Sequence, residues 1–188
     1  MRIIAGNFKG KKILEPRDKS TRPLKDLAKE SLFNIIHHSN KLTVTIKGSY
    51  ILDLFSGVGS FGLECLSRGA SFVTFAENYK EVLPVLKKNI TNLKCQDKSS
   101  IIEKNIFEKI DFNNFKSKFD VIFIDPPFKE NKLNDLIDKI IKSKILNKDG
   151  IIIIHRHKKE KDAFSKNFNI IENKTYGISK IIFGNLVN

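Results

Sequence analysis

The sequence predicts an α/β fold in which a mostly parallel β-sheet carries helices on both faces. Short apolar runs of strand length alternate along the chain with segments whose apolar residues recur at helical spacing. One run, 119–124, is apolar enough for a central strand that is covered on both faces. Because ligands of such sheets bind beyond the carboxyl ends of the strands, we expect the functional residues there.

The chain before residue 50 predicts a small extension to this sheet. Residues 2–5 and 11–15 are expected to form a basic hairpin, and the apolar residues of segment 24–36 fall on one face of a helix. Pro23 suits the first turn of that helix, where its missing N–H costs nothing.

From residue 50 onward, strands and helices are expected in turn. Strands are expected at 50–54, 72–76, 100–103, 119–124 and 151–154. A turn and a helix are expected at 57–68, and further helices at 79–91, 133–141 and 158–166. Pro84 implies a kink or a later start in the helix at 79–91. The segments 168–172 and 178–183 predict a closing hairpin around Gly177.

The composition is that of one globular domain with a basic surface. The 188 residues carry a net charge of +13, which favours a polyanion such as RNA as partner, although solvated lysines would give the same charge. Two cysteines are too few for a disulfide framework or a zinc cluster, so we expect a reducing cytoplasm. No apolar run approaches the roughly 20 residues of a membrane span. We expect a monomer that uses neither a membrane nor a metal ion.

A glycine-rich turn follows the first expected strand. Gly57, Gly59 and Gly62 match the pattern G-x-G-x-x-G between a strand and a helix, where glycines let the backbone approach a nucleotide closely. Sites for NAD, FAD and S-adenosylmethionine all use such a turn, and Phe55 at its start is assigned to the same cofactor site.

The positions of two acidic residues indicate which of these cofactors the site binds. Asp53 precedes the glycines, and its carboxylate could engage the ammonium group that S-adenosylmethionine has and NAD lacks. Glu77 closes the second strand beside Asn78 and could accept hydrogen bonds from both ribose hydroxyls. The alternative is that Asp53 caps a turn and Glu77 is a surface acid. After the third strand, Asn105 and the N–H of Ile106 could contact adenine, although Asn is also a common turn residue.

The run Asp125-Pro126-Pro127-Phe128 follows the fourth strand directly. Two prolines fix the backbone, so a rigid turn displays a carboxylate, a carbonyl and an aromatic ring. The Asp125 carboxylate and the Pro126 carbonyl could each accept one hydrogen of an exocyclic base amine, while Phe128 stacks on the flipped base. This pattern predicts methyl transfer to an amine by orientation and electrostatics. A tight turn with an incidental Asp is the alternative.

These motifs and their surroundings resemble the bacterial 16S ribosomal RNA guanine-N2 methyltransferases of the RsmD family. The resemblance covers nearly the whole chain, and its most specific parts are Arg22-Pro23 ahead of segment 30–34 and the segment 62–70. The glycine turn and Asp-Pro-Pro-Phe are shared with other amino methyltransferases. The chain departs from the family at Leu24, Asn105 and His155, where Thr, Asp and Glu are usual, and around Leu27, near which an Arg is usual.

The resemblance implies a class I S-adenosylmethionine-dependent methyltransferase fold, which is Rossmann-like with a seven-stranded, mostly parallel sheet and a reversed C-terminal hairpin. It implies methylation of N2 of one guanine in 16S rRNA, either free or in an assembling small ribosomal subunit. It also implies that residues 1–46 form an RNA-contacting extension of a methyltransferase domain, residues 47–188. The residues assigned to RNA are Arg2, Lys9, Lys11, Lys12 and Arg22.

Three other functions stay open. The same motif permits methylation of adenine N6 in RNA or DNA. Protein glutamine amides present a similar NH₂ group, but that chemistry normally goes with Asn in the place of Asp125. A non-catalytic RNA-binding protein on this fold is the third, and the intact Asp53 and Glu77 count against it. Segment 155–159, which contains two of the four histidines, is interpreted as a solvated loop, and the alternative is that it faces the site or RNA because it follows a strand. Cys65 is interpreted as a small core residue.

Overall fold

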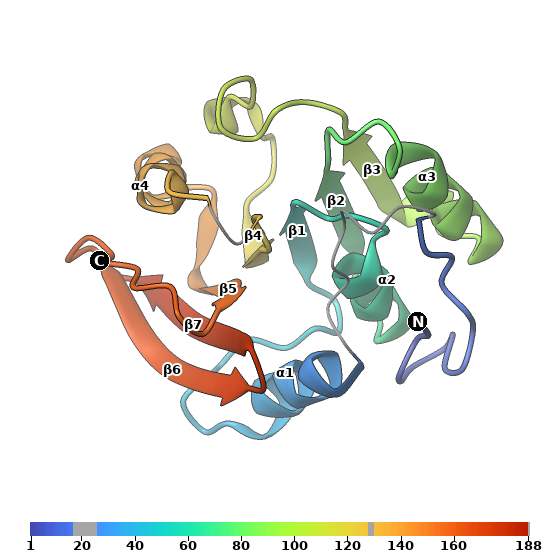
Figure 1. The fold of residues 1–188 in the computed structure, drawn as a ribbon, viewed down its shortest axis with the longest axis horizontal. Coiled ribbons are helices and arrows are strands. Elements are labelled where there is room, and N and C mark those ends of the chain that lie inside the picture. The colour runs from blue at the N-terminus through green and yellow to red at the C-terminus, as the bar shows by residue number, and fades with distance from the viewer. Residues whose placement is uncertain (17–25, 128–129, 188) are drawn as a thin grey trace.

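The computed structural model describes residues 1–16, 26–127 and 130–187. At its centre is a seven-stranded sheet in the order β3-β2-β1-β4-β5-β7-β6 (Figure 1). The parallel strands are β1 (Tyr50–Leu54), β2 (Phe72–Ala76), β3 (Ser99–Ile102), β4 (Phe119–Ile124) and β5 (Leu146–His157). The strands β6 (Phe168–Tyr176) and β7 (Ser179–Leu186) form an antiparallel hairpin, and β7 also runs antiparallel to β5. The strand order reverses between β1 and β4, which is where ligands of such sheets bind.

Helices cover both faces of this sheet. One face carries α1 (Asp26–His38), α2 (Ser60–Ser67) and α3 (Leu83–Asn92). The other carries α4 (Leu133–Ser143) and a short 3₁₀ turn, η2 (Phe112–Asn114). A second 3₁₀ turn, η1 (Gln96–Lys98), precedes β3. No helix in the described parts of the chain is long and apolar enough to cross a membrane.

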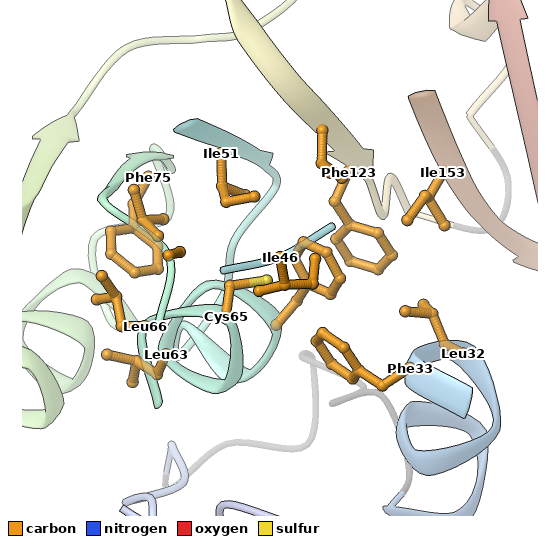
Figure 2. Close-up of a cluster of buried hydrophobic side chains, with 14 of the residues drawn as sticks. Leu32, Phe33, Ile46, Ile51, Leu63, Cys65, Leu66, Phe75, Phe123 and Ile153 are labelled. Atoms are coloured by element: carbon orange, nitrogen blue, oxygen red, sulfur yellow. The ribbon is translucent and has the colours of Figure 1, made fainter. Parts of the chain in front are cut away.

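Alternation along the strands creates two separate cores. In β1, Ile51 packs toward α1–α3 and its neighbour Leu52 toward α4, because successive side chains of a strand point to opposite faces. Figure 2 shows the first core, in which Phe123 and Ile153 of the sheet lie near Phe33 of α1. Cys65 is fully buried in this core, which confirms its predicted role.

A stack of three aromatic rings fixes α1 to the sheet. The ring centroids of Phe33 and Phe61 are 5.4 Å apart, and those of Phe61 and Phe123 are 4.1 Å apart. The guanidinium of Arg68 lies 4.3 Å from the centroid of Phe33 and covers the end of the stack. The stack therefore joins α1, α2 and β4.

The N-terminal segment is held on α2 by a buried carboxylate. Glu64 accepts hydrogen bonds from the backbone N–H groups of Ile4 (2.8 Å) and Ala5 (2.9 Å). The same carboxylate pairs with Arg68 (2.9 Å) and with Lys29 of α1 (3.6 Å). Burial lowers the pKa of Lys29, and the charge of Glu64 opposes that shift. Glu64 thus joins the N-terminal segment, α1 and α2.

Most of the predicted elements are confirmed, with local differences. The expected hairpin near the N-terminus consists of one antiparallel bridge, between Arg2 and Lys12. The helix containing Pro84 begins later than 79, and Pro84 lies in its first turn. Leu27 does not face the core as expected but is 70% exposed. Pro23 and Leu24 lie outside the described residues.

The helix predicted at 158–166 is wrong. This segment forms a turn and irregular chain after β5, which is longer than expected. Asp162 pairs with Arg156 of β5 (3.0 Å) and with Lys180 of β7 (3.3 Å), so the segment is tied to the sheet by charge. These contacts with β5 and β7, which the local helical pattern does not include, accompany the loss of the helix.

Candidate functional site

Four side chains meet at the carboxyl edge of the sheet, around the point where the strand order reverses. They are Asp53 in β1, Glu77 after β2, Asp125 after β4 and His155 in β5. Each continues the alternation of the strand residues that face α1–α3. The negative charges of Asp125 and Glu77 both act on Asp53, in agreement with this shared location.

Asp53 is a buried carboxylate with a partner on only one of its oxygens. Its Oδ2 accepts a hydrogen bond from the N–H of Gly62 at 3.0 Å, and Oδ1 is buried without a hydrogen-bond partner among the described residues. Burial raises the pKa of Asp53 well above its usual range, the hydrogen bond from Gly62 opposes this, and the charges of Asp125 and Glu77 raise it further. The prediction that Asp53 only caps the following turn accounts for Oδ2 and leaves Oδ1 unexplained. A ligand ammonium group fits this acceptor.

Glu77 ties the turn after β2 to the glycine turn. Its Oε2 accepts from the N–H of Gly57 (2.8 Å), and its Oε1 accepts from the N–H groups of Asn78 (2.8 Å) and Tyr79 (2.9 Å). Glu77 is buried, so its interpretation as a surface acid is wrong. A carboxylate has about four lone-pair sites, and the three backbone donors leave acceptor capacity for a hydroxyl.

The glycine turn is shaped by a close approach at Gly62 and an opening at Gly57. Gly62 must lack a side chain because a Cβ would lie 2.4 Å from the ring of Phe75. Gly57 has a φ of +55°, and apart from its two chain neighbours no described residue has an atom within 4 Å of where its Cβ would be. Phe55 also has a positive φ, of 60°, and its ring lies 5.1 Å from that of Phe107, centroid to centroid. The backbone at Gly57 is therefore open to a ligand, beside a pair of aromatic rings.

Asn105 caps the turn that follows β3. Its Oδ1 accepts a hydrogen bond from the N–H of Phe107 at 3.0 Å, which is the turn role considered from the sequence. The next residue, Ile106, is buried in the core on the α4 side. Contact of these two residues with adenine stays a prediction, and Asn105 would have to share Oδ1 between the turn and the base.

The turn after β4 is fixed at both of its ends. The N–H of Asp125 donates to the carbonyl of Leu54 at 3.2 Å, and the Asp125 Oδ1 lies 2.8 Å from Nδ1 of His155. Pro126 is buried and Pro127 exposed, and the carbonyl of Pro127 accepts from the N–H of Glu130 at 2.9 Å. Phe128 lies outside the described residues.

The interpretation of segment 155–159 as a solvated loop is wrong for its first two residues. His155 and Arg156 belong to β5 and are 4% and 2% exposed. Arg156 donates to the carbonyls of Pro127 (3.4 Å) and Glu130 (3.0 Å), so it contacts the far end of the turn that begins at Asp125. The sequence did not indicate that β5 extends to His157, and this extension is what buries His155 and Arg156.

The residues assigned to RNA fall into two groups. Four of them are exposed on the N-terminal segment, namely Arg2, Lys9, Lys11 and Lys12. Arg22 lies outside the described residues. Asn89 of α3 connects this segment to the glycine turn, since its Nδ2 donates to the carbonyls of Leu14 (3.1 Å) and Val58 (3.0 Å). Within the described ranges, no group of three His, Cys, Asp or Glu side chains could hold a metal ion.

The strand order, the reversed β6–β7 hairpin and the glycine turn after β1 together define a class I S-adenosylmethionine-dependent methyltransferase fold. The chain belongs to the family described as "Conserved hypothetical protein 95", whose model matches residues 1–185. This membership and the relatives below confirm the resemblance to the RsmD family.

The chain is 35% identical over 179 residues to "Ribosomal RNA small subunit methyltransferase D" of Haemophilus influenzae. The matched region covers 95% of this chain and 90% of that protein. Among solved structures, a "Putative methyltransferase" from Escherichia coli matches with a TM-score of 0.80 and 26% identity, over 98% of this chain and 96% of that one. A "putative sam-dependent methyltransferase" from Streptococcus mutans shares the fold, with a TM-score of 0.66 and 15% identity over 87% of this chain and 49% of that one.

Proposed function

We propose that this protein transfers a methyl group from S-adenosylmethionine to the N2 amine of a guanine in 16S rRNA of the small ribosomal subunit. The observation that carries the proposal is the buried Oδ1 of Asp53, which has no hydrogen-bond partner in the described part of the chain and lies at the same edge of the sheet as Asp125. The name of the Haemophilus influenzae relative supports small-subunit rRNA as the substrate.

The cofactor would be held by the ends of β1, β2 and β3. Asp53 Oδ1 accepts a hydrogen bond from the ammonium group of the cofactor. This contact gives Oδ1 a partner and offsets the free-energy cost of burying the Asp53 charge. Glu77 accepts hydrogen bonds from the ribose hydroxyls. The nucleoside is surrounded by the open backbone of Gly57, by Gly59 and Phe55, and by the residues after β2 and β3. When bound, S-adenosylmethionine supplies an activated methyl group on a sulfonium centre.

Asp125 and the turn after it orient the accepting amine. Its carboxylate and the Pro126 carbonyl each accept one N–H of the guanine amine, and this favours a pyramidal nitrogen with its lone pair directed at the methyl carbon. The N–C bond forms as the S–C bond breaks, and the proton then lost from nitrogen passes to Asp125 or to water. Phe128 stacks on the base that is flipped out of the RNA.

The N-terminal part would hold the RNA. Residues 1–46 form the RNA-contacting extension of the methyltransferase domain, residues 47–188, and Arg2, Lys9, Lys11, Lys12 and Arg22 contact phosphates. We further propose that the protein acts in the cytoplasm as a monomer, on 16S rRNA or on an assembling small subunit, and that it uses no metal ion.

Nucleoside analysis of small-subunit rRNA tests this function. Cells lacking the protein, and the same cells supplied with Asp125→Ala, should both lose one N2-methylguanosine that the unchanged protein restores. Loss of an N6-methyladenosine instead would replace guanine by adenine as the substrate. An unchanged set of methylated nucleosides would overturn the proposal, and calorimetry with S-adenosylmethionine would then show whether the chain binds the cofactor without catalysing transfer.

A further inference from the structure

Asp125 and His155 are neighbours because of the register between β4 and β5. The last paired residues of the two parallel strands are Ile124 and Ile154, so the residues that follow lie next to each other on the same face. Their side chains meet, with Asp125 Oδ1 and His155 Nδ1 2.8 Å apart. His155 is also held from the other side, since β5 pairs with β7 at Ile181.

The chemistry of the two groups determines which one donates. An ionised carboxylate only accepts hydrogen bonds, so Nδ1 of His155 must carry the proton in this contact. The bond occupies Oδ1 of Asp125 and fixes the plane of the carboxylate, which directs Oδ2 away from the imidazole. The His155 side chain is 5% exposed and that of Asp125 is 19% exposed, so the pair is shielded while one side of the carboxylate reaches solvent.

The next residue of β5 supports the same turn from the opposite face of the sheet. Arg156 is buried and donates to the carbonyls of Pro127 (3.4 Å) and Glu130 (3.0 Å). Its own position is fixed by Asp162, whose Oδ1 accepts from Nε at 3.0 Å. The end of β5 therefore holds the beginning of the turn through His155 and its far end through Arg156.

The structure assigns to His155 the role of a positioning residue, which donates from Nδ1 to Asp125 Oδ1 so that Oδ2 faces the amine to be methylated. The inference rests on the proposed function of Asp125 and adds a residue outside the Asp-Pro-Pro-Phe motif. The dependence on orientation is steep, because a misplacement of about 1 Å can reduce a rate roughly 100-fold.

Two substitutions of similar size separate donation from packing. His155→Asn keeps an N–H donor near the place of Nδ1, and His155→Leu removes it. We expect His155→Leu to lower kcat by roughly 10- to 100-fold, with little change in the KM for RNA or the Kd for S-adenosylmethionine. His155→Asn should recover most of that loss. His157→Leu, a matched imidazole removal two residues further along β5, should leave kcat near that of the unchanged protein.

The outcomes distinguish this inference from the function on which it rests. Normal kcat in His155→Leu, with Asp125→Ala inactive, would overturn the role of His155 and leave the function intact. Equal losses in His155→Leu and His155→Asn would also overturn it, because donation would then not matter. A readout independent of activity is the ¹⁵N NMR spectrum of the imidazole. The proton should lie on Nδ1 and should lose that preference in Asp125→Ala, whereas a proton on Nε2 in the unchanged protein would contradict the assignment.

Discussion

Glu64 and Asp53 are both buried carboxylates, 0% and 1% exposed, and they serve opposite purposes. Both oxygens of Glu64 are occupied, by the N–H groups of Ile4 and Ala5 and by the side chains of Arg68 and Lys29. Asp53 receives one N–H and keeps a buried oxygen without a partner among the described residues. A buried charge that is fully paired joins parts of the fold, whereas an incompletely paired one costs free energy that a ligand can recover.

Removing the charge of Glu64 should have the largest effect on stability. Glu64→Gln leaves Lys29 buried without a charged partner, so the free energy of unfolding should fall by about 3–5 kcal/mol, as for other broken buried pairs. Urea unfolding would measure it. Glu103→Gln, which disrupts an exposed pair with Lys87, is the control and should leave the unfolding midpoint unchanged. An equally small effect at Glu64 would show that its partners contribute little.

The matching substitution at Asp53 should affect binding instead of folding. Asp53→Asn keeps the shape of the side chain and removes the charge that would meet the ammonium group. Because hydrogen bonds to charged groups contribute about 1.5–3 kcal/mol, the Kd for S-adenosylmethionine should rise roughly 10- to 100-fold. Without cofactor the variant should be at least as stable as the unchanged protein. A variant that unfolds more easily and binds normally would make Asp53 a structural residue like Glu64.

The pH dependence of stability should separate the two carboxylates again. Because the pKa of Asp53 is raised in the folded state, its contribution to stability is fully present at low pH and is lost as pH rises through that raised pKa. The advantage of Asp53→Asn over the unchanged protein should therefore grow with pH above the usual range of an aspartate. Unfolding curves at several pH values, without cofactor, would measure it. Parallel pH profiles of the two proteins would contradict the raised pKa.

The smallest expected effect concerns the exposed lysines of the segment that Glu64 anchors. Replacing Lys11 and Lys12 by Gln should weaken RNA binding several-fold without changing the unfolding midpoint. The slope of log K against log salt should decrease in magnitude by about 0.7 for each single-stranded phosphate contact that is lost. Filter binding at several salt concentrations would measure this slope. An unchanged slope would remove these lysines from the RNA surface.

The strands could be predicted well because their signal is local. Asp53, Glu77 and Asp125 each follow or end a short apolar run, and the parallel sheet that such runs predict brings the ends together at one edge. The glycine turn is also a local pattern, and its spacing after an apolar run predicts the turn at Gly57 that leads into α2, the helix that contains Gly62. These positions could therefore be predicted from the sequence alone.

The partners of these residues could not be predicted in the same way. The pairing of His155 with Asp125 depends on the register of two strands that are 30 residues apart in the sequence. The contacts of Glu64 with Ile4 and Ala5 span about 60 residues. A lysine at position 29 in an amphipathic helix suggests a solvated charge, and only its partners explain why it is buried.

Binding of two ligands to two proteins tests directly whether Asp53 recognises the ammonium group of the cofactor. S-adenosylhomocysteine carries the ammonium group, and 5′-methylthioadenosine lacks the entire amino-acid part. Calorimetry should show that the unchanged protein strongly prefers S-adenosylhomocysteine and that Asp53→Asn loses much of this preference, because the unpaired Oδ1 is what recognises the ammonium group. The same preference in both proteins would show that Asp53 does not recognise the ammonium group and that it is a structural carboxylate like Glu64.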